Sequence, residues 1–172
     1  ISILGLRIPA ALDDRYGFVR QIPVAERPLV FIGPYEHHSN ELPWRESIAE
    51  IVVIDEDADG RIDLGHLERE LRSHASRRFK IGSFSAASNV TGIRSETAAI
   101  ATLLHQHGAL SCWDYAAAAP YVSIDMNPPG GTSADPAAKD AVFISPHKFV
   151  GGPGTPGVLV VKRRILHNRV PS

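Results

Sequence analysis

The chain has little cysteine, almost no net charge and no long hydrophobic run, and each shortage excludes a class of protein. Cys112 is its one cysteine, so no disulfide can form within the chain, and we expect a reducing, cytoplasmic location. The formal net charge of −1 provides no basic surface for nucleic acid. No apolar run approaches the roughly 20 residues that a membrane-spanning helix needs, which excludes a membrane span.

The length of 172 residues is that of one domain able to bury a hydrophobic core. The sequence starts without methionine, already within an apolar stretch, and it stops at Pro171 and Ser172 with no closing pattern. We therefore expect residues 1–172 to form one domain that is incomplete at both ends, a piece of a longer protein.

Short apolar runs alternate with helical patterns along the chain. The predicted helices are Leu64–His74, with Asp63 as N-cap, and Ser95–His107, with Gly108 as its stop. The compact, β-branched runs predict strands at Leu29–Ile32, Glu50–Ile54, Phe79–Phe84, Leu110–Trp113, Ala141–Ser145 and Gly157–Lys162. This alternation indicates an α/β fold, a mostly parallel sheet with helices on both faces. Asn127–Asp140, rich in Pro, Gly, Ala and Asp, is expected to be an exposed loop.

Ligands of such open sheets bind beyond the carboxyl ends of the strands. Polar residues follow four predicted strands at that edge: Glu36-His37-His38, Ser88-Asn89, Asp114 and Ser145-Pro146-His147-Lys148. Four strand ends therefore bring histidines, an amide, a carboxylate and a lysine to one edge, which predicts a single site there.

Lys148 and Asp114 suggest the chemistry of that site. Lys148 lies between a strand and a glycine-rich run, and a lysine amine so placed can form a Schiff base with a carbonyl cofactor. Asp114 ends an apolar strand and needs a cation or donor as partner, such as the N–H of a pyridinium ring. Pyridoxal 5′-phosphate has both the carbonyl and the ring. A solvated loop lysine, and a helix cap or internal salt bridge for the aspartate, are the alternatives.

The remaining candidates are less specific. His37 or His38 can stack on a cofactor ring or move protons. A metal site is the weaker reading, because adjacent histidines on an extended segment point in opposite directions and no metal-ligand spacing accompanies them. Ser145 and His147 can donate to a phosphate. Asn89 can contact cofactor oxygen or a substrate carboxylate, or can be a plain turn residue.

Two further patterns imitate known motifs. Asp55–Asp63 resembles the first part of a calcium-binding loop, but His66 stands where the bidentate glutamate belongs, so we interpret it as an acidic turn before a capped helix. The glycine-rich run after Lys148 resembles a phosphate-binding P-loop. In a P-loop, however, the lysine follows the glycines, whereas Lys148 precedes them, so no such loop is indicated.

Taken together, these residues resemble the class V aminotransferase family of fold-type I pyridoxal-phosphate enzymes, in particular its cysteine desulfurase and selenocysteine lyase branch. The resemblance extends from about Leu29 to Lys162. It rests on Glu36-His37-His38-Ser39-Asn40 with Pro43-Trp44, on Ser88-Asn89-Val90-Thr91-Gly92, on His105-Gln106-His107-Gly108-Ala109, on Asp114, and on Ser145-Pro146-His147-Lys148.

The resemblance implies a role for each candidate. Lys148 looks like the Schiff-base lysine, Asp114 like the partner of the pyridine nitrogen, and His37 like the ring-stacking residue. Asn89 is similar to the amide that contacts cofactor oxygen or substrate carboxylate. Ser145 and His147 look like phosphate ligands.

The resemblance further implies a homodimeric enzyme acting on a small amino acid. One position departs from the desulfurases, where a glutamine three residues after the aspartate contacts the cofactor's phenolic oxygen; this chain has Ala117. The family's phosphate loop is expected before residue 1, and its cysteine loop and carboxylate-binding arginine after residue 172. The expected reaction is therefore desulfuration or another class V reaction such as amino transfer or racemisation. The alternative is a non-catalytic binding protein that retained the scaffold.

Overall fold

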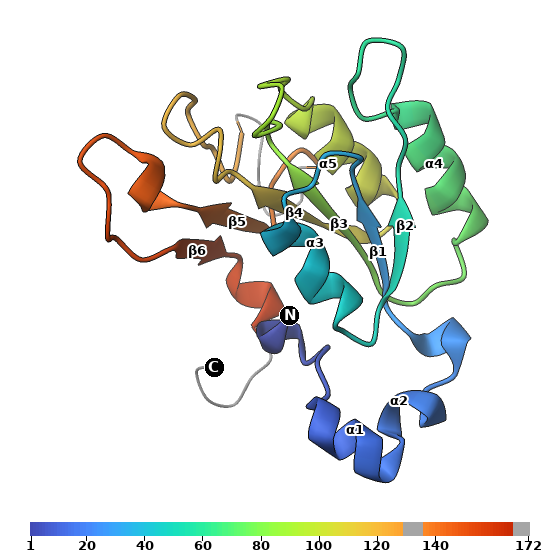
Figure 1. The fold of residues 1–172 in the computed structure, drawn as a ribbon. Helices are drawn as coiled ribbons and strands as arrows, with labels where there is room; N and C mark the ends of the chain where they lie inside the picture. Colours follow the sequence, from blue (N-terminus) through green and yellow to red (C-terminus); the bar gives the residue numbers. More distant parts are fainter. Residues whose placement is uncertain (129–135, 167–172) are drawn as a thin grey trace.

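The computed structural model describes residues 1–128 and 136–166. Its strands form a six-stranded sheet in the order β2-β1-β3-β4-β5-β6. They are β1 (Leu29–Ile32), β2 (Glu50–Val53), β3 (Lys80–Ser85), β4 (Ala109–Asp114), β5 (Ala141–Ile144) and β6 (Val158–Val161). The first five run parallel, and β6 is antiparallel to β5 (Figure 1). The carboxyl ends of five strands therefore lie at the same edge of the sheet.

Helices lie on both faces of the sheet. They are α1 (Ala10–Tyr16), α2 (Phe18–Gln21), α3 (His38–Arg45), α4 (Leu64–Ser73) and α5 (Thr97–Gln106), with short 3-10 turns η1 (Ser2–Leu4), η2 (Val24–Glu26), η3 (Pro146–Lys148) and η4 (Arg163–Ile165). Helices α4 and α5 cover one face and α3 the other, while α1 and α2 extend below the sheet (Figure 1). None of the helices in the described part of the chain is long and apolar enough to cross a membrane.

Side-chain alternation along the strands divides the core into two layers. In β1, Leu29 and Phe31 pack with α4 and α5, whereas Val30 and Ile32 pack with Trp44 of α3. All four side chains are buried, as expected for a parallel strand with both faces covered. Such burial stabilises a side chain of this size by about 1.5–3 kcal/mol.

Helix α4 forms where its capping and apolar residues predict it. The Asp63 carboxylate accepts a hydrogen bond from the His66 backbone N–H at 3.0 Å, and this bond lowers the pKa of the Asp63 carboxyl. Leu67 and Leu71 are buried, whereas Leu64 at the helix start is partly exposed. The turn before the helix closes through Asp57, whose carboxylate accepts from the backbone N–H groups of Asp59 and Arg61. The interpretation of this segment as an acidic turn before a capped helix is confirmed.

The predicted α/β fold, with a mostly parallel sheet and helices on both faces, is confirmed. Helix α5 begins at Thr97, two residues later than expected. Each strand begins and ends within one residue of its predicted bounds. The predicted exposed loop is only partly described, since residues 129–135 lie outside the described residues. Lys139 and Asp140 in that segment are buried, so there the expectation of exposure was wrong: both side chains have polar partners, and the Lys139 amine donates to the Asp125 carbonyl.

A buried ionic cluster joins α5 to the amino end of β5. The Asp140 carboxylate accepts from the Ser111 N–H at 2.9 Å and pairs with Arg164 and with His105, whose Nε2 lies 2.9 Å away. The other ring nitrogen of His105 faces the Pro136 carbonyl oxygen at 2.7 Å. Because both partners are acceptors, the ring is expected to carry protons on both nitrogens.

This cluster makes stability depend on pH. The hydrogen bond to Asp140 raises the pKa of His105, against the effect of burial. Burial opposes ionisation of Asp140, but the hydrogen bonds it accepts outweigh burial, so the pKa of Asp140 is lowered. A raised histidine pKa contributes stability that is complete below about pH 6.5, the unfolded-state value, and is lost as pH rises through the folded-state pKa. The lowered pKa of Asp140 contributes stability that is complete above about pH 3.9, the unfolded-state value. This stability is lost as pH falls through the folded-state pKa.

We therefore expect His105→Gln to lower the free energy of unfolding of the full-length protein by about 1–3 kcal/mol at pH 5–6, the range for hydrogen bonds to charged groups. The difference from wild type should shrink as pH rises above about 6.5. Denaturant titrations across this pH range measure it. His107→Gln at the same helix end is the control, since its side chain has no hydrogen bond or ion pair with the described residues. A wild-type advantage that stayed constant with pH would contradict the assignment.

Candidate active site

The carboxyl edge of the sheet brings the predicted site residues to one side of the molecule. The segment after β1 leads into α3, the segment after β3 contains Asn89, β4 ends at Asp114, and β5 leads through Ser145 into η3. This edge also contains a pocket of about 490 Å³, within the size range of small-molecule sites. Its polar lining includes Ser39, Asn40, Asp114 and Ser145, and its apolar lining includes Trp44, Phe143, Val158 and Leu159.

Asp114 is the most buried of the charged side chains that line this pocket. Its side chain is largely buried, and its backbone carbonyl accepts from the Ala86 N–H at 2.8 Å. One carboxylate oxygen, Oδ1, accepts from the Ala116 N–H at 2.7 Å. No lysine, arginine or histidine of the described residues forms an ion pair with it. Asp114 therefore caps a turn; neither the helix cap nor the salt bridge given as alternatives is present among the described residues, and its carboxylate also lines a pocket in which a ring N–H can donate to it.

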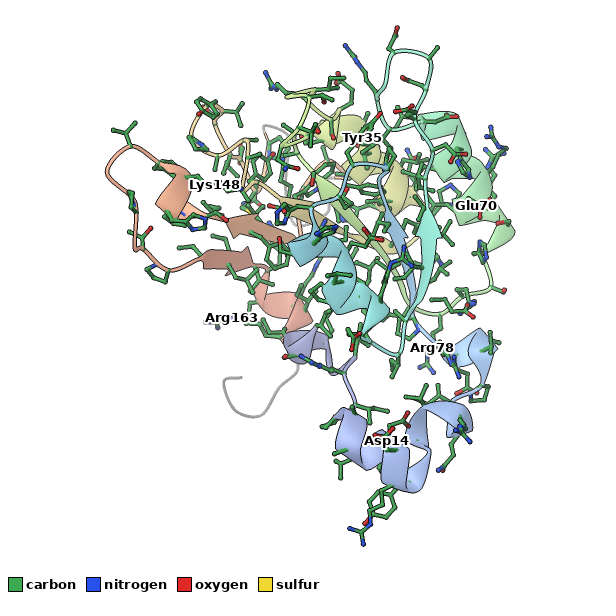
Figure 2. All side chains as sticks on the ribbon, viewed as in Figure 1. Asp14, Tyr35, Glu70, Arg78, Lys148 and Arg163 are labelled. Carbon is green, nitrogen blue, oxygen red and sulfur yellow. The ribbon has the colours of Figure 1, made fainter. Side chains whose placement is uncertain are left out.

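Lys148 ends the 3-10 turn η3, directly after β5 (Figure 2). Its backbone N–H donates to the Ser145 carbonyl at 3.0 Å, and its side chain is exposed. The amine has no ion pair or hydrogen bond with residues 1–128 and 136–166. Ser145 lines the pocket, whereas Lys148 and His147 lie next to it in sequence and do not line it.

The turn that holds Lys148 depends on close backbone contact with Gly152. A Cβ atom at this position would lie 2.0 Å from the Pro146 carbonyl oxygen and 3.1 Å from that of Phe149. The Gly152 N–H also donates to the Phe149 carbonyl at 2.9 Å. Only glycine fits without displacing η3, which explains one position of the glycine-rich run.

We expect Gly152→Ala to lower the free energy of unfolding of the full-length protein by about 1–3 kcal/mol, because the new methyl group meets backbone and not a movable side chain. Gly157→Ala is the matched control: its Cβ would lie 3.8 Å from the Ile144 carbonyl oxygen, an ordinary contact. Chemical denaturation of both variants measures the difference. Equal stability of the two would show that the loop moves away from Pro146 at no cost.

His37 caps helix α3. Its Nδ1 accepts from the Ser39 backbone N–H at 3.2 Å and lies 2.8 Å from the Ser39 hydroxyl. In this contact Nδ1 acts as the acceptor, which leaves Nε2 as the ring nitrogen that can donate. His37 does not line the pocket, but Ser39 does.

The two adjacent histidines do not point in opposite directions. His37 has an extended backbone, as expected, but His38 is the first residue of α3, so the expectation of an extended segment was wrong from His38 onward. The two ring centroids lie 6.1 Å apart. Across the described residues, no group of three or more histidine, cysteine, aspartate or glutamate side chains could hold a metal ion.

Asn89 is exposed and does not line the pocket. The neighbouring Ser88 is buried, and its hydroxyl accepts from the backbone N–H groups of Val90 and Thr91, both at 3.2 Å. The turn shape is thus set by Ser88, and a role of Asn89 toward a cofactor stays a prediction.

Two positions bear on the reaction type. Ala117 lies half-buried in the turn after Asp114 and has no side-chain donor, so it cannot replace a glutamine. Cys112 is buried, and burial, with the nearby Asp140 charge, raises the pKa of its thiol to about 12. A protonated, buried thiol is not a nucleophile, which supports the core role of Cys112.

Sequence reasoning missed a set of residues that build the pocket wall. Asn40 and Trp44 line the pocket, and Glu36 contacts Asn40. Asn40 and Trp44 are four residues apart within α3 and so lie on one side of the helix, and this spacing was the available signal. Glu36 precedes the helix, and no local pattern indicated its contact.

The pocket suits pyridoxal phosphate in its size and in part of its polar lining. Asp114 and Ser145 lie together there, where one can accept from a ring nitrogen and the other can donate to a phosphate oxygen. Lys148 lies on the turn that starts at Ser145, and His37 is hydrogen-bonded to the pocket residue Ser39.

Comparison with known proteins shows similarity to class-V aminotransferases over most of the chain. The family model for class-V aminotransferases matches residues 18–172. A probable cysteine desulfurase of Halalkalibacterium halodurans is 32% identical over 146 residues, which cover 83% of this chain and 33% of the relative. A cysteine desulfurase of Shigella sonnei is 31% identical over 148 residues, again covering 83% of this chain and 33% of the relative. The chain thus spans about a third of the curated relatives that it matches.

Solved structures share the fold at lower identity. The cysteine desulfurase CsdA from Escherichia coli has a TM-score of 0.64 and 24% identity, covering 82% of this chain and 33% of that structure. Alanine–glyoxylate aminotransferase from a Nostoc species has a TM-score of 0.64 and 18% identity, covering 90% and 41%. These likenesses support the fold alone. With the family model matching nearly all of its length, the chain belongs to the class-V aminotransferase family.

Proposed function

We propose that this chain is the cofactor-binding part of a pyridoxal-phosphate-dependent enzyme that acts on an amino acid. The observation that carries the proposal is the pocket at the carboxyl edge of the sheet, which joins Asp114 and Ser145 beside the turn that ends in Lys148. Family membership supports it. When bound, pyridoxal phosphate supplies a ring that withdraws electrons from the substrate carbon next to the amine.

Each residue of the chain has a definable task in this proposal. The Asp114 carboxylate keeps a proton on the ring nitrogen, and its cap to Ala116 fixes the orientation of the carboxylate. The Lys148 amine holds the cofactor and then moves a proton at the substrate α-carbon through Nζ. Ser145 and His147 bind the phosphate, His37 stacks on the ring, and Asn89 contacts cofactor oxygen or the substrate carboxylate.

Cysteine desulfuration is the first candidate among specific reactions, because curated relatives over 30% identical have this name. The second candidate is amino transfer, favoured by Ala117, which removes the glutamine donor expected in desulfurases. We further propose that the full-length protein is a homodimer, which light scattering tests. A cytoplasmic location stays a prediction from the one cysteine.

The test uses the full-length protein with added pyridoxal phosphate. It is incubated with L-cysteine, and separately with other L-amino acids and a keto acid, while sulfide, alanine and amino-transfer products are measured. With excess dithiothreitol in the assay to reduce the sulfur removed from cysteine, sulfide and alanine in equal amounts support desulfuration, and amino transfer without sulfide supports the second candidate. A protein that gains no visible absorption band from the cofactor and forms no product would instead be a non-catalytic binding protein.

A further inference from the structure

The carboxylate of Glu36 is held by four donors from three parts of the fold. Its Oε1 accepts from the backbone N–H groups of Gly33 at 3.2 Å and Ser85 at 2.9 Å. Its Oε2 accepts from the Ser85 hydroxyl and from Asn40 Nδ2, both at 2.7 Å. One side chain thus ties together the segment after β1, the end of β3 and the first turn of α3.

The contact to Asn40 continues into a buried polar chain. Asn40 Oδ1 accepts from the Ser83 hydroxyl at 2.8 Å, and the Ser83 oxygen accepts from Trp44 Nε1 at 3.0 Å. Asn40, Ser83 and Trp44 are all buried. Asn40 and Trp44 are also walls of the pocket, so the chain that begins at Glu36 ends in the pocket lining.

Two further neighbours of Glu36 adjoin residues that line the pocket. His37 follows it directly and caps α3. Ser85, its partner on β3, stands beside Asp114 in the register of β3 and β4. Burial raises the pKa of the Glu36 carboxyl in spite of the four hydrogen bonds, so the fold keeps a carboxylate there at some cost in stability.

We propose that Glu36 is the positioning residue of the cofactor pocket: its carboxylate fixes the start of α3 against the ends of β1 and β3 and thereby places His37, Asn40 and Trp44. This inference rests on the proposed function. Glu36 does not line the pocket, so it acts through the residues that do. Its loss leaves two part-buried backbone N–H groups, those of Gly33 and Ser85, without this acceptor and frees α3 to shift.

Asp140 provides a matched control for a purely structural role. It is also a buried carboxylate that accepts several hydrogen bonds, but it lies at the amino end of β5, at the opposite edge of the sheet. Glu36→Ala and Asp140→Ala both remove a buried carboxylate and should both lower the midpoint of thermal unfolding. Only Glu36→Ala should alter the pocket.

The experiment titrates pyridoxal phosphate into the full-length apoprotein and records the dissociation constant and the circular dichroism of the bound cofactor in its visible band. For Glu36→Ala we expect the dissociation constant to rise at least about tenfold, equivalent to about 1.4 kcal/mol, with a weaker dichroism signal. For Asp140→Ala we expect a constant within about twofold of wild type and an unchanged signal. If Glu36→Ala does not fold, Glu36→Gln is compared with Asp140→Asn instead. Glutamine keeps the size of the side chain, but its amide nitrogen cannot accept the hydrogen bonds that one Glu36 oxygen accepts, so the hold on α3 is weakened.

The outcomes separate the two proposals. Wild-type affinity and signal in the Glu36 variant, or equal losses in both members of the pair, would overturn the positioning role while the proposed function stands. A wild-type protein that binds no pyridoxal phosphate would overturn the proposed function and this role with it.

Discussion

Asp114→Asn is expected to slow turnover of the full-length enzyme by two or more orders of magnitude, equivalent to about 2.7 kcal/mol or more of activation barrier. The amide is neutral and cannot keep a proton on the ring nitrogen, so the ring withdraws electrons less strongly. The fold should not change, because the amide oxygen can accept from the Ala116 N–H as Oδ1 of Asp114 does. Steady-state rates with the preferred amino acid, compared at saturating cofactor, measure the effect.

Asp114→Ala separates the two tasks of this residue. Alanine removes both the charge and the cap, so this variant should lose turnover and also lose about 0.5–2 kcal/mol of stability, the range for a lost side-chain cap. Asp114→Asn should keep wild-type stability. Near-normal turnover in Asp114→Asn would mean that the residue is a structural cap and nothing more.

Lys148→Ala is expected to have the second large effect, a loss of turnover of at least about 10³-fold, or roughly 4 kcal/mol. Without the amine, η3 has no group that can hold the cofactor covalently, and the proton transfer proposed at the α-carbon loses its base. The exposed side chain makes no hydrogen bond or ion pair with the described residues that would be lost, so stability should stay within about 0.5 kcal/mol of wild type. Lys162→Ala is the control, because its amine contacts Asn127 and not the pocket. A Lys148→Ala protein as active as Lys162→Ala would contradict the assignment.

The sequence predicted the parts of the fold that depend on local patterns. Four consecutive apolar residues mark β1, and its bounds were correct because both sheet faces are covered there. Asp63 marked the start of α4 through one short-range hydrogen bond. Asp114 and Ser145 were found because parallel strands bring their carboxyl ends to one edge, which is a rule of topology and needs no side-chain detail.

The rest depended on contacts between distant parts of the chain. Glu36 bonds to Ser85, 49 residues away, and Asn40 to Ser83, 43 residues away, and no local pattern shows such pairs. The buried Asp140 was assigned to an exposed loop because its partners, His105 and Arg164, lie on other elements. His37 and His38 were both placed on an extended segment, whereas the capping bond from Ser39 to His37 starts a helix at His38.

The structure leaves four predicted residues outside the pocket lining: His37, Asn89, His147 and Lys148. His37 is hydrogen-bonded to the pocket residue Ser39, His147 and Lys148 lie on the turn that starts at Ser145, and all four residues are exposed. The rotamers of exposed side chains on turns often change when a ligand binds. The roles of these four residues therefore stay predictions. Lys148 is the one whose role a single chemical experiment can establish.

That experiment is reductive labelling of the full-length protein. Pyridoxal phosphate is added, the complex is reduced with borohydride, and the labelled peptide is identified by mass spectrometry. The account predicts one dominant pyridoxyl label on Lys148. A label on Lys80, Lys139 or Lys162 with none on Lys148 would contradict it.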